Sequence, residues 1–554
     1  MKHRRFSILA LTVLLVATLS VACGVALSGC GGTSGTSSTS ASAQATPKEG
    51  GTLVVAYQAE PTSLDPAIAW NVSDWAVEDV IFEGFFRYTS KPGVAGTELE
   101  PTLAERMPTV NADNTVYTIP LKRGIKFQPP VNREVTAEDF KYSFERMMRL
   151  PQAPATFYYT GIVGAQEYID KKVDHISGFK VLDPYTVQIT LTSPDSTILN
   201  ALEMKFCSVV PKEWVEKWGE KKIARHPLGT GPFMFDHWTP SQEVVVKRNP
   251  NYRDPGRVWL DEIKFATSLT PQMATLKLQR GEVDVLGDNL PAADIARLTA
   301  DPNWKDNVAS MRQIAVENLF MNVQFKPFDN VKVRQAICWA INRDKLVKLV
   351  GGAAEPLWQV YPDGMPGHVP GKKYYGYDPA KAKALLAEAG YPNGFKTTLY
   401  TDNVDPRPKI MTSIQADLKA IGITAPVRTM SNAAYYTFST TPHTASAGAS
   451  LWIMDFPDPH DWMPLYNKAN AVKGGMNSTF WWSPQLEQMI DDAQATTDAQ
   501  ARIVKYEKIQ DYIMEQAPYA SMYQPVMTTM FSKNVGGFQT HLVYGWEPQW
   551  MWKK

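Results

Sequence analysis

Apolar and polar positions follow a period of two in several short stretches after residue 50. Residues 51–57 are apolar and rich in β-branched side chains, which predicts a buried strand. Residues 116–121 and 187–191 alternate between apolar and polar positions and predict two half-buried strands. Because this period places successive side chains on opposite faces, we expect these segments to belong to sheets with one buried face.

A helical period lies between these strands. Thr136 is predicted to cap a helix, with Asp139 reaching back to the cap in a capping-box arrangement. The apolar stripe of this helix consists of Phe140, Phe144 and Met147 or Met148.

Helices become longer in the second half of the chain. Asn330 is predicted to cap a helix with four apolar positions, Val333, Ile337, Ile341 and Leu346. A second helix begins at Asp378-Pro379 and ends before Gly390, because Pro is favoured in a first turn and Gly just past an end. A third runs from about 498 to 516, with Ile503, Tyr506, Ile509 and Ile513 facing inward. Strands that alternate with helices throughout predict an α/β fold.

The first thirty residues follow neither period. A basic start at Lys2, His3, Arg4 and Arg5 precedes an apolar run over residues 6–22 and the stretch Leu27-Ser28-Gly29-Cys30. This order is typical of an export signal, and its ending resembles a lipobox, at which the cysteine receives a diacylglyceryl group. We therefore predict a signal peptide over residues 1–30 and a lipid on Cys30. An uncleaved transmembrane anchor is the alternative, since the apolar run is almost long enough to span a bilayer.

The segment that follows Cys30 is nearly all Gly, Ser, Thr and Ala up to residue 46. It cannot bury enough apolar surface to fold, so residues 31–49 are predicted to be a flexible linker. The expected location of the rest of the chain is the outer face of the cell membrane, or the periplasm, with the lipid as its anchor.

Composition narrows the classes of partner. The chain has 554 residues, with 56 Lys plus Arg and 56 Asp plus Glu. Because basic and acidic residues balance, the composition does not indicate a nucleic-acid partner. Beyond Cys30 only Cys207 and Cys338 remain, and we expect free thiols. The 16 tryptophans could stack on sugars or fill cores.

Motifs of catalysis are lacking. The sequence contains no Gly-x-Ser-x-Gly, His-Glu-x-x-His or Cys-x-x-Cys, and Gly229-Thr230-Gly231 lacks the rest of a phosphate loop. A small group, Asp455, Asp458, His460 and Asp461, could hold a cation, but Pro457 and Pro459 make it an irregular loop. We predict no metal and no cofactor, and we expect a binding protein rather than an enzyme.

Ordered sequence blocks carry a resemblance. They are Gly50-Gly51-Thr52-Leu53, Thr62-Ser63-Leu64-Asp65-Pro66, Phe82-Glu83-Gly84-Phe85, Pro101-Thr102-Leu103-Ala104-Glu105, Thr136-Ala137-Glu138-Asp139-Phe140, Gly229-Thr230-Gly231-Pro232-Phe233, Arg248-Asn249-Pro250-Asn251-Tyr252, Gly281-Glu282-Val283-Asp284, Asn322 with Val333-Arg334-Gln335-Ala336, and Leu385-Leu386-Ala387-Glu388-Ala389-Gly390-Tyr391. Together, in this order, they resemble the family 5 extracellular solute-binding proteins of bacterial ABC importers, which include the oligopeptide- and dipeptide-binding proteins. The resemblance covers essentially everything from Gly50 to the C-terminus.

The resemblance implies a two-lobed α/β flytrap with an additional subdomain inserted in lobe one. Lobe one would comprise residues 50–90, 223–310 and 526–554, the insert residues 91–222, and lobe two residues 311–525. Hinge strands would cross near residues 310 and 525.

The implied function is a membrane-tethered receptor that captures peptides between its lobes and delivers them to an ABC importer. Lobe closure would bury the solute and present a closed surface to the permease, and the cytoplasmic ATPase would supply the energy. Partners would thus be a peptide or other small solute, the permease with its ATPase, and the membrane through the lipid, with no nucleic acid. A monomer is expected.

The ligand-binding residues that the resemblance implies lie in three places. Peptide-binding members carry a Trp-x-x-Asp, matched here by Trp452 and Asp455, in which the Asp pairs with the ammonium of the ligand and the Trp lines the pocket. An Asp beside Pro-rich turns also often bonds to local backbone. The loop after Pro66 adds Trp70, Asn71 and Val72, although Trp70 could equally pack between segments. Tyr523 matches a pocket position loosely.

One departure keeps other ligands open. Tripeptide binders place arginines shortly before that Asp, whereas residues 431–454 contain no Lys or Arg, and His443 is the only candidate cation. The ligand could be a longer peptide held by its backbone, an oligosaccharide or a metal chelate. Two other classes stay open: an exported hydrolase that uses Asp455 and Asp458 as paired carboxylates, and a receptor that delivers its ligand to a sensor.

Overall fold

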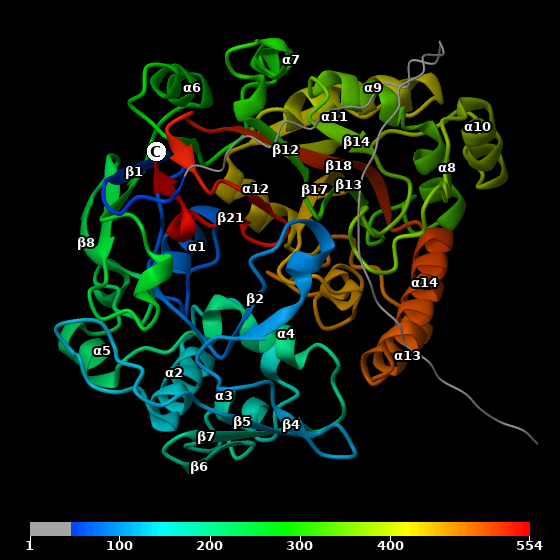
Figure 1. The fold of residues 1–554 in the computed structure, drawn as a ribbon. Coiled ribbons are helices and arrows are strands. Elements are labelled where there is room, and N and C mark those ends of the chain that lie inside the picture. The colour runs from blue at the N-terminus through cyan, green and yellow to red at the C-terminus, as the bar shows by residue number, and fades with distance from the viewer. Residues whose placement is uncertain (1–45) are drawn as a thin grey trace, which may run out of the picture. The chain divides into compact units, whose positions relative to one another are not determined.

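Three β-sheets organise the structure (Figure 1). This computed structural model describes residues 46–554, so the predicted signal over 1–30, Cys30 and most of the linker over 31–49 lie outside the described residues. Residues Pro47–Lys554 form one compact unit. Within the described residues, no helix is both long and apolar enough to cross a membrane.

The first sheet has five strands in the order β11-β1-β10-β9-β8. Their bounds are β1 Thr52–Ala56, β8 Phe233–Thr239, β9 Glu243–Arg248, β10 Glu262–Ala266 and β11 Val285–Leu286. β1 pairs in parallel with both β10 and β11. Its apolar side chains are buried, Leu53 and Val55 completely, as the period of the sequence predicts.

The second sheet has seven strands in the order β12-β18-β13-β17-β15-β16, with β14 paired to β18. Their bounds are β12 Val308–Arg312, β13 Ala315–Met321, β14 Ala354–Pro356, β15 Leu399–Asp402, β16 Val427–Met430, β17 Ala447–Ile453 and β18 Tyr519–Met530. The far end of β18 reaches the first sheet, where Thr529 Oγ1 donates to Leu286 O at 2.7 Å. β12 and β18 therefore connect the two sheets.

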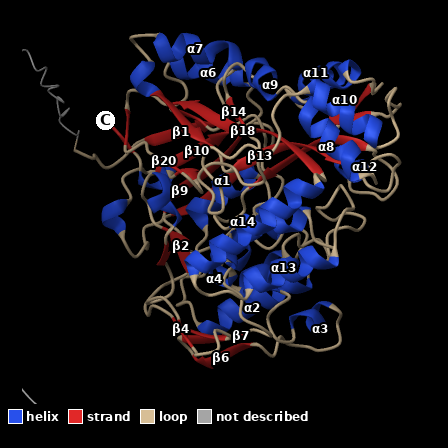
Figure 2. Cartoon of the chain, turned by 90° about the vertical axis from the view of Figure 1, so that its right-hand side faces the viewer, coloured by secondary structure: helices blue, strands red, loops and turns tan. Residues whose placement is uncertain are grey.

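The third sheet has four antiparallel strands in the order β4-β5-β7-β6. Their bounds are β4 Thr109–Val110, β5 Val116–Pro120, β6 Phe179–Asp183 and β7 Thr186–Thr190. Helices α2 and α3 lie next to this sheet in both views (Figures 1 and 2). Three short pairs complete the strands: β2 Phe86–Tyr88 with β3 Leu99–Pro101, β19 Val535–Gly536 with β22 Trp552–Lys553, and β20 Thr540–His541 with β21 Gly545–Trp546.

The helices of the N-terminal part are α1 Val72–Ile81, α2 Ala137–Arg149, α3 Ala165–Ile169, α4 Ile198–Glu203, α5 Lys212–Trp218, α6 Pro271–Gln279 and α7 Ala292–Ala300. Those of the C-terminal part are α8 Val331–Ala340, α9 Arg343–Leu349, α10 Pro379–Glu388, α11 Arg407–Ala420, α12 Asn432–Ser439, α13 Pro484–Gln494 and α14 Ala499–Gln516. The predicted capping box of α2 is present, with both the Thr136 and Asp139 side chains bonded to backbone N–H groups.

One predicted helix was wrong in its extent. The apolar pattern from Val333 to Leu346 belongs to two helices, because Ile341 is extended and Asn342 begins a new helix by accepting a hydrogen bond from Lys345 N at 3.0 Å. The apolar positions are nevertheless buried. The spacing of buried apolar residues thus continues across the break between α8 and α9, and only the cap residue Asn342 indicates that break.

Each of the three sheets has its own hydrophobic core, and a residue just after β17 packs in the core of another sheet. Phe456 follows β17 in the chain, yet it packs in the core of the four-stranded sheet. Its ring meets that of Tyr158 edge-on, with centroids 5.5 Å apart. The four-stranded region and the end of β17 are therefore in direct apolar contact.

Candidate functional site

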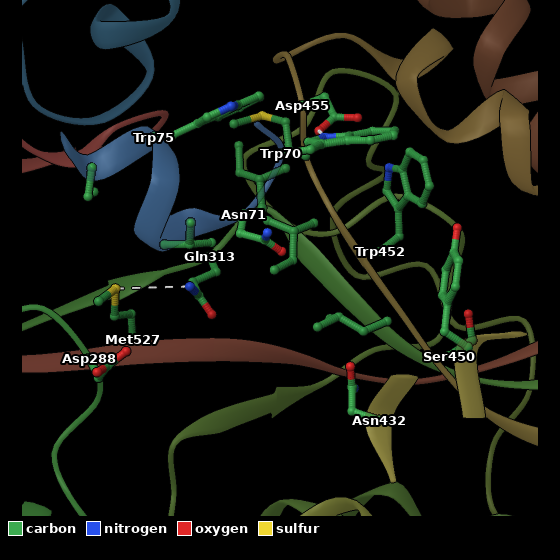
Figure 3. Close-up of a pocket in the computed structure, with 18 of the residues that line it drawn as sticks. Trp70, Asn71, Trp75, Asp288, Gln313, Asn432, Ser450, Trp452, Asp455 and Met527 are labelled. Carbon is green, nitrogen blue, oxygen red and sulfur yellow. Dashed lines mark hydrogen bonds between the residues drawn. The ribbon is translucent and has the colours of Figure 1, made fainter. Parts of the chain in front are cut away.

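A cavity of about 1030 Å³ is lined by segments that are far apart in the sequence (Figure 3). The end of β1, the face of α1 and the hairpin β20–β21 contribute to it, together with β17 and α12 of the seven-stranded sheet. Its volume is at the upper end of what small-molecule sites offer.

Helix α1 presents one face to the cavity. Val72, Trp75, Ala76 and Asp79 line it, and their spacing of three and four places puts them on one side of a helix. Asn71 caps the helix and its side-chain amide donates to Asp74 Oδ2 at 3.0 Å, which orients the start of α1 at the cavity.

Strand β17 forms the opposite wall. It pairs with β13 along its whole length, but its ladder with β15 ends at the pair Tyr400↔Gly448. Beyond Gly448, no strand of the described residues pairs with that edge of β17. Residues 449–455 all line the cavity, so a strand edge without a partner strand borders it, and the Tyr435 hydroxyl donates to Ala449 O at its start at 2.6 Å.

The carboxylate of Asp455 lies at the end of this wall and is held by two distant donors. Trp70 Nε1 donates to Oδ1 at 3.0 Å, and the Tyr158 hydroxyl donates to Oδ2 at 2.7 Å. Both donors come from outside the seven-stranded sheet, so Asp455 does not merely bond to local backbone. Trp70 also packs on Phe206, edge to face, with ring centroids 6.0 Å apart, so it lines the cavity and fills space between segments at once.

A second carboxylate lies directly behind the first. Asp461 is completely buried and accepts hydrogen bonds from Trp452 Nε1 at 3.0 Å and from Asp455 N at 3.2 Å. The Tyr158 hydroxyl is within 3.3 Å of its Oδ1 as well. Trp452 thereby fixes the carboxylate that supports Asp455, in addition to lining the cavity.

Burial shifts the pKa values of both Asp455 and Asp461. Burial raises the pKa of Asp455 to about 6, while the hydrogen bonds from Trp70 and Tyr158 act in the opposite direction. Burial and the neighbouring Asp455 raise the pKa of Asp461 well above its ordinary value. Among the described residues, neither carboxylate forms an ion pair with Lys, Arg or His. A cation placed in the cavity beside Asp455 would offset the cost of burying this charge.

Asp458 does not share this environment. Its carboxylate forms a bidentate ion pair with Arg502, with Nη2 to Oδ1 at 2.6 Å, and it is absent from the cavity wall. The paired-carboxylate geometry that a hydrolase would need from Asp455 and Asp458 is therefore not present. Nor do His, Cys, Asp and Glu side chains gather anywhere in residues 46–554 in a group that could hold a metal.

Arg407, which the sequence reasoning missed, also lines the cavity. It begins α11, and its Nε donates to Glu317 Oε1 at 3.2 Å while Nη1 donates to Asp402 Oδ2. In the described part of the chain, no side chain or carbonyl accepts a hydrogen bond from its Nη2. Its position just after the parallel strand β15 is the signal that could have identified it, because ligands gather at the carboxyl ends of such strands.

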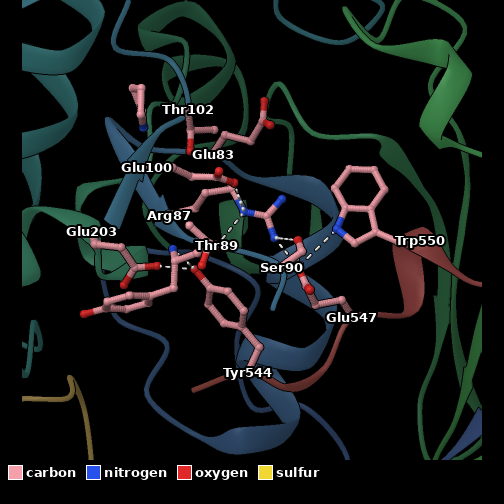
Figure 4. Close-up of polar contacts among 12 residues, drawn as sticks. Glu83, Arg87, Thr89, Ser90, Glu100, Thr102, Glu203, Tyr544, Glu547 and Trp550 are labelled. Carbon is pink, nitrogen blue, oxygen red and sulfur yellow. Dashed lines mark hydrogen bonds and ion pairs between the residues drawn. The ribbon is translucent and has the colours of Figure 1, made fainter. Parts of the chain in front are cut away.

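The C-terminal hairpin is a further part of the wall that the sequence did not indicate, and Figure 4 shows the polar contacts around it. The Tyr544 hydroxyl donates to Glu203 Oε1 at 2.6 Å and accepts from Tyr88 N at 2.8 Å. Burial raises the pKa of Glu203 to about 7. Glu547, which follows the hairpin, forms an ion pair with Arg87. These contacts hold the hairpin against β2 and α4 at one side of the cavity.

The remaining predicted residues are placed as follows. Trp70, Asn71, Val72, Trp452 and Asp455 lie together on the cavity wall. Tyr523 lies in β18 opposite Glu317, is buried and is not among the lining residues, so its ligand contact stays a prediction. Cys207 and Cys338 are free, buried thiols, as expected.

Known proteins share this architecture and this length. The model of the bacterial extracellular solute-binding proteins, family 5 middle region, matches residues 98–474. The glutathione-binding protein GsiB of Shigella dysenteriae is 30% identical over 501 residues, which are 88% of this chain and 91% of that protein.

Solved structures of other binding proteins have the same fold. The ABC transporter-associated periplasmic binding protein DppA from Helicobacter pylori, in complex with the peptide STSA, superposes with a TM-score of 0.78 at 27% identity, covering 91% of this chain and 98% of that one. AgaA from Agrobacterium tumefaciens R10, in complex with agropinic acid, has a TM-score of 0.75 at 26% identity, covering 91% and 98%.

The chain therefore belongs to the family 5 bacterial extracellular solute-binding proteins. Its fold is the two-lobed α/β fold of periplasmic binding proteins, as the sequence predicted. Its relatives bind solutes rather than transform them, and the expectation of a binding protein instead of an enzyme is confirmed.

Proposed function

We propose that this protein captures peptides in the cavity beside Asp455 and delivers them to an ABC importer. The observation that carries the proposal is the pair Asp455 and Asp461, two carboxylates without a cationic partner, one of which faces the cavity. The N-terminal ammonium of a peptide would donate to Asp455 and supply the missing charge. Charge-assisted hydrogen bonds of this kind are about twice as strong as neutral ones.

The strand edge of β17 would hold the peptide backbone. Residues 449–453 present an edge that β15 does not cover, next to Asp455. An extended peptide can add to such an edge by main-chain hydrogen bonds, which give affinity without demanding particular side chains. This arrangement suits the lack of Lys and Arg in residues 431–454, because the ligand is then gripped by its backbone.

Arg407 would receive the carboxylate of the ligand. Its Nη2 is free of protein partners in the described residues, and a guanidinium can bind a carboxylate through its remaining donors. The ammonium and the carboxylate of the ligand would then both be bound at the same wall of the cavity.

Two lobes would close over the peptide. We take lobe one as residues 50–90, 223–310 and 526–554, the insert as 91–222 and lobe two as 311–525, with β12 and β18 as the hinge. Hydrogen bonds join lobe two to the other two parts: Trp70 and Tyr158 donate to Asp455, and Ser196 Oγ donates to Gln494 O at 3.0 Å. Ligand contacts made only in the closed state would shift the population toward it.

A non-peptide solute is the second candidate. Four indoles line the cavity, those of Trp70, Trp75, Trp452 and Trp546, and aromatic faces stack well on sugars. The related AgaA, whose complex contains agropinic acid, holds a ligand that is not a peptide. An oligosaccharide receptor predicts that Trp452→Ala or Trp70→Ala abolishes sugar binding, while Asp455→Asn has no ammonium-specific effect.

The test is to identify the ligand that the protein carries. The full chain is extracted from membranes in mild detergent, purified and denatured, and the released molecules are identified by mass spectrometry. Peptides are expected, and Asp455→Asn should release markedly less of them than Asp458→Asn, whose carboxylate pairs with Arg502 away from the cavity. Recovery of saccharides without peptides would refute the peptide assignment.

We also propose that a lipid on Cys30 tethers the protein to the outer face of the cell membrane, and that a permease with its cytoplasmic ATPase receives the peptide. A tether raises the effective concentration of the receptor at the permease. The linker over residues 31–49 would let the lobes turn and dock as a monomer.

A further inference from the structure

Asp288 occupies a place where ligands gather in α/β folds. β1 and β11 are parallel neighbours, with Ala56 opposite Leu286, so their carboxyl ends meet at one edge. Tyr57 follows the first strand, and Asp288 follows the second after a single glycine. That glycine is required, because a Cβ on Gly287 would come within 2.4 Å of the Tyr57 ring. The ring thereby holds the Asp288 backbone at the cavity.

The carboxylate of Asp288 has capacity left for a ligand. Its Oδ2 accepts a hydrogen bond from Gln58 N, and no other protein donor reaches it in residues 46–554. Nor does any Lys, Arg or His of those residues form an ion pair with it. The side chain is half-buried in the cavity wall, and burial raises its pKa. A nearby cation would relieve that burial cost.

Two methionines lie in the wall near Asp288. Met311 and Met527 are opposite each other in the β12–β18 ladder and both line the cavity, and Gln313 Nε2 rests 3.9 Å from Met527 Sδ. Figure 3 shows Asp288 next to Met527 and well away from Asp455, Trp70 and Trp452. Methionine side chains adapt to flexible aliphatic chains. Apolar side chains near a carboxylate match a side chain with a methylene stem and a cationic head.

The charges of the whole wall favour such a ligand. The lining carboxylates are Asp79, Glu203, Asp288, Asp402 and Asp455. The lining cations are Lys205 and Arg407. Lys205 is paired with Asp79 at 2.6 Å, and Arg407 is paired with both Asp402 and Glu317. Glu203 accepts a hydrogen bond from the Tyr544 hydroxyl and has no cation paired with it. Carboxylates without a paired cation are therefore left at Glu203, Asp288 and Asp455, and Asp288 and Asp455 lie at separate places in one cavity.

We infer that Asp288 and the apolar side chains of Met311 and Met527 form a side-chain subsite for a basic residue, so that the protein selects peptides containing Lys or Arg. The inference rests on the proposed function, since it takes the peptide ammonium to be bound at Asp455. Glutathione has two carboxylates and one ammonium, so it has no second cationic group that Asp288 could bind.

A peptide series tests the subsite. Tetra-alanine peptides carry a single Lys, norleucine or Glu at position two, three or four, and the detergent-extracted full chain binds them in competition with a fluorescent peptide. Norleucine reproduces the stem of Lys without its charge. We expect Lys to be preferred over norleucine by about tenfold at one position, with Glu the weakest.

Asp288→Asn is expected to abolish this preference while leaving the affinity for tetra-alanine within about twofold, since the Asn side-chain oxygen can still accept from Gln58 N. Glu282→Gln removes the same charge from an exposed position outside the cavity and should keep the preference. If Asp288→Asn does not fold, the Lys, norleucine and Glu peptides are compared on the unmodified protein alone. Equal affinities for the Lys and norleucine peptides at every position would then overturn the subsite.

The outcomes separate the two proposals. Binding of peptides without a Lys preference at any position, or a preference that survives in Asp288→Asn, would overturn the subsite alone. Failure of every peptide to bind would overturn the peptide assignment, and the subsite with it.

Discussion

The indole of Trp70 donates to the carboxylate of Asp455 at 3.0 Å, although the two residues are 385 positions apart. Trp70 precedes α1, whereas Asp455 follows β17. The bond therefore joins the two walls of the cavity and fixes the orientation of the Asp455 carboxylate through its Oδ1. It also favours the ionised form of a buried acid.

Trp70→Phe should keep the ring in place and remove this bond. We expect peptide affinity at neutral pH to fall by about tenfold, because a hydrogen bond to a charged group contributes about 1.5–3 kcal/mol. Calorimetric titration with a peptide checks this. Trp75→Phe is the matched control, since the Trp75 indole also lines the cavity but donates to Ala69 O instead of to Asp455. Equal losses in both variants would contradict the specific role of Trp70.

Peptide affinity should decrease as the pH falls through about 6, the pKa to which burial raises Asp455. A protonated Asp455 has no charge to offer an ammonium. Binding near this pH should release protons, which titrations in buffers of different ionisation enthalpy measure directly. In Asp455→Asn this pH dependence should be absent.

The stability of the ligand-free protein should change with pH in the opposite direction. The folded state raises the pKa of Asp455 above its ordinary value, so it holds the proton more tightly than the unfolded chain does. This group then stabilises the fold below about pH 4, and its contribution is lost as the pH rises through about 6. Thermal melts of unmodified protein and Asp455→Asn, compared at pH 5 and 7, isolate the contribution. A difference between them that does not vary with pH would contradict it.

Arg407→Lys should weaken the binding of peptides with a free C-terminal carboxylate and spare their C-terminal amides. Lysine keeps the charge beside Glu317 and Asp402 but cannot reproduce the guanidinium fork. We expect the ratio of acid to amide affinity to fall about three- to tenfold in competition assays. An unchanged ratio would place the ligand carboxylate elsewhere.

Glu78 offers a prediction on stability. It is completely buried in α1, and neither oxygen of its carboxylate has a hydrogen-bond partner. Burial and the neighbouring carboxylate of Asp74 raise its pKa well above the ordinary value. Glu78→Met, of similar length, should therefore stabilise the protein by about 1–3 kcal/mol, with the larger effect at higher pH. Chemical denaturation measures this, with the exposed Glu282→Gln as the control. A destabilised Glu78→Met would show that the carboxyl group is needed.

Cys30→Ser is expected to release an intact, ligand-competent protein from the membrane fraction. Serine cannot accept the lipid that anchors the proposed receptor. Fractionation, followed by peptide binding to the released protein, is the measurement. Retention of the variant in the membrane would favour the uncleaved anchor instead.

Local elements could be predicted where neighbouring residues decide the structure. The capping box at Thr136 and the strand after Gly51 need only a few adjacent positions, and both form as predicted. The break at Asn342 escaped prediction, because apolar spacing continues through it and the cap is a single polar residue. Asp455 and Trp452 could be named because they share one short motif.

The sequence by itself determined the family, the α/β class and five residues of the cavity wall, since ordered motifs and periodicity are properties of the chain. Only the tertiary structure decided what surrounds Asp455. Tyr158 reaches Asp455 from a distant segment, Asp461 reaches it across the loop after β17, and Arg407 and Asp288 line the same cavity from different sheets. Proximity between distant segments depends on how the sheets pack, and that packing determines which groups surround Asp455.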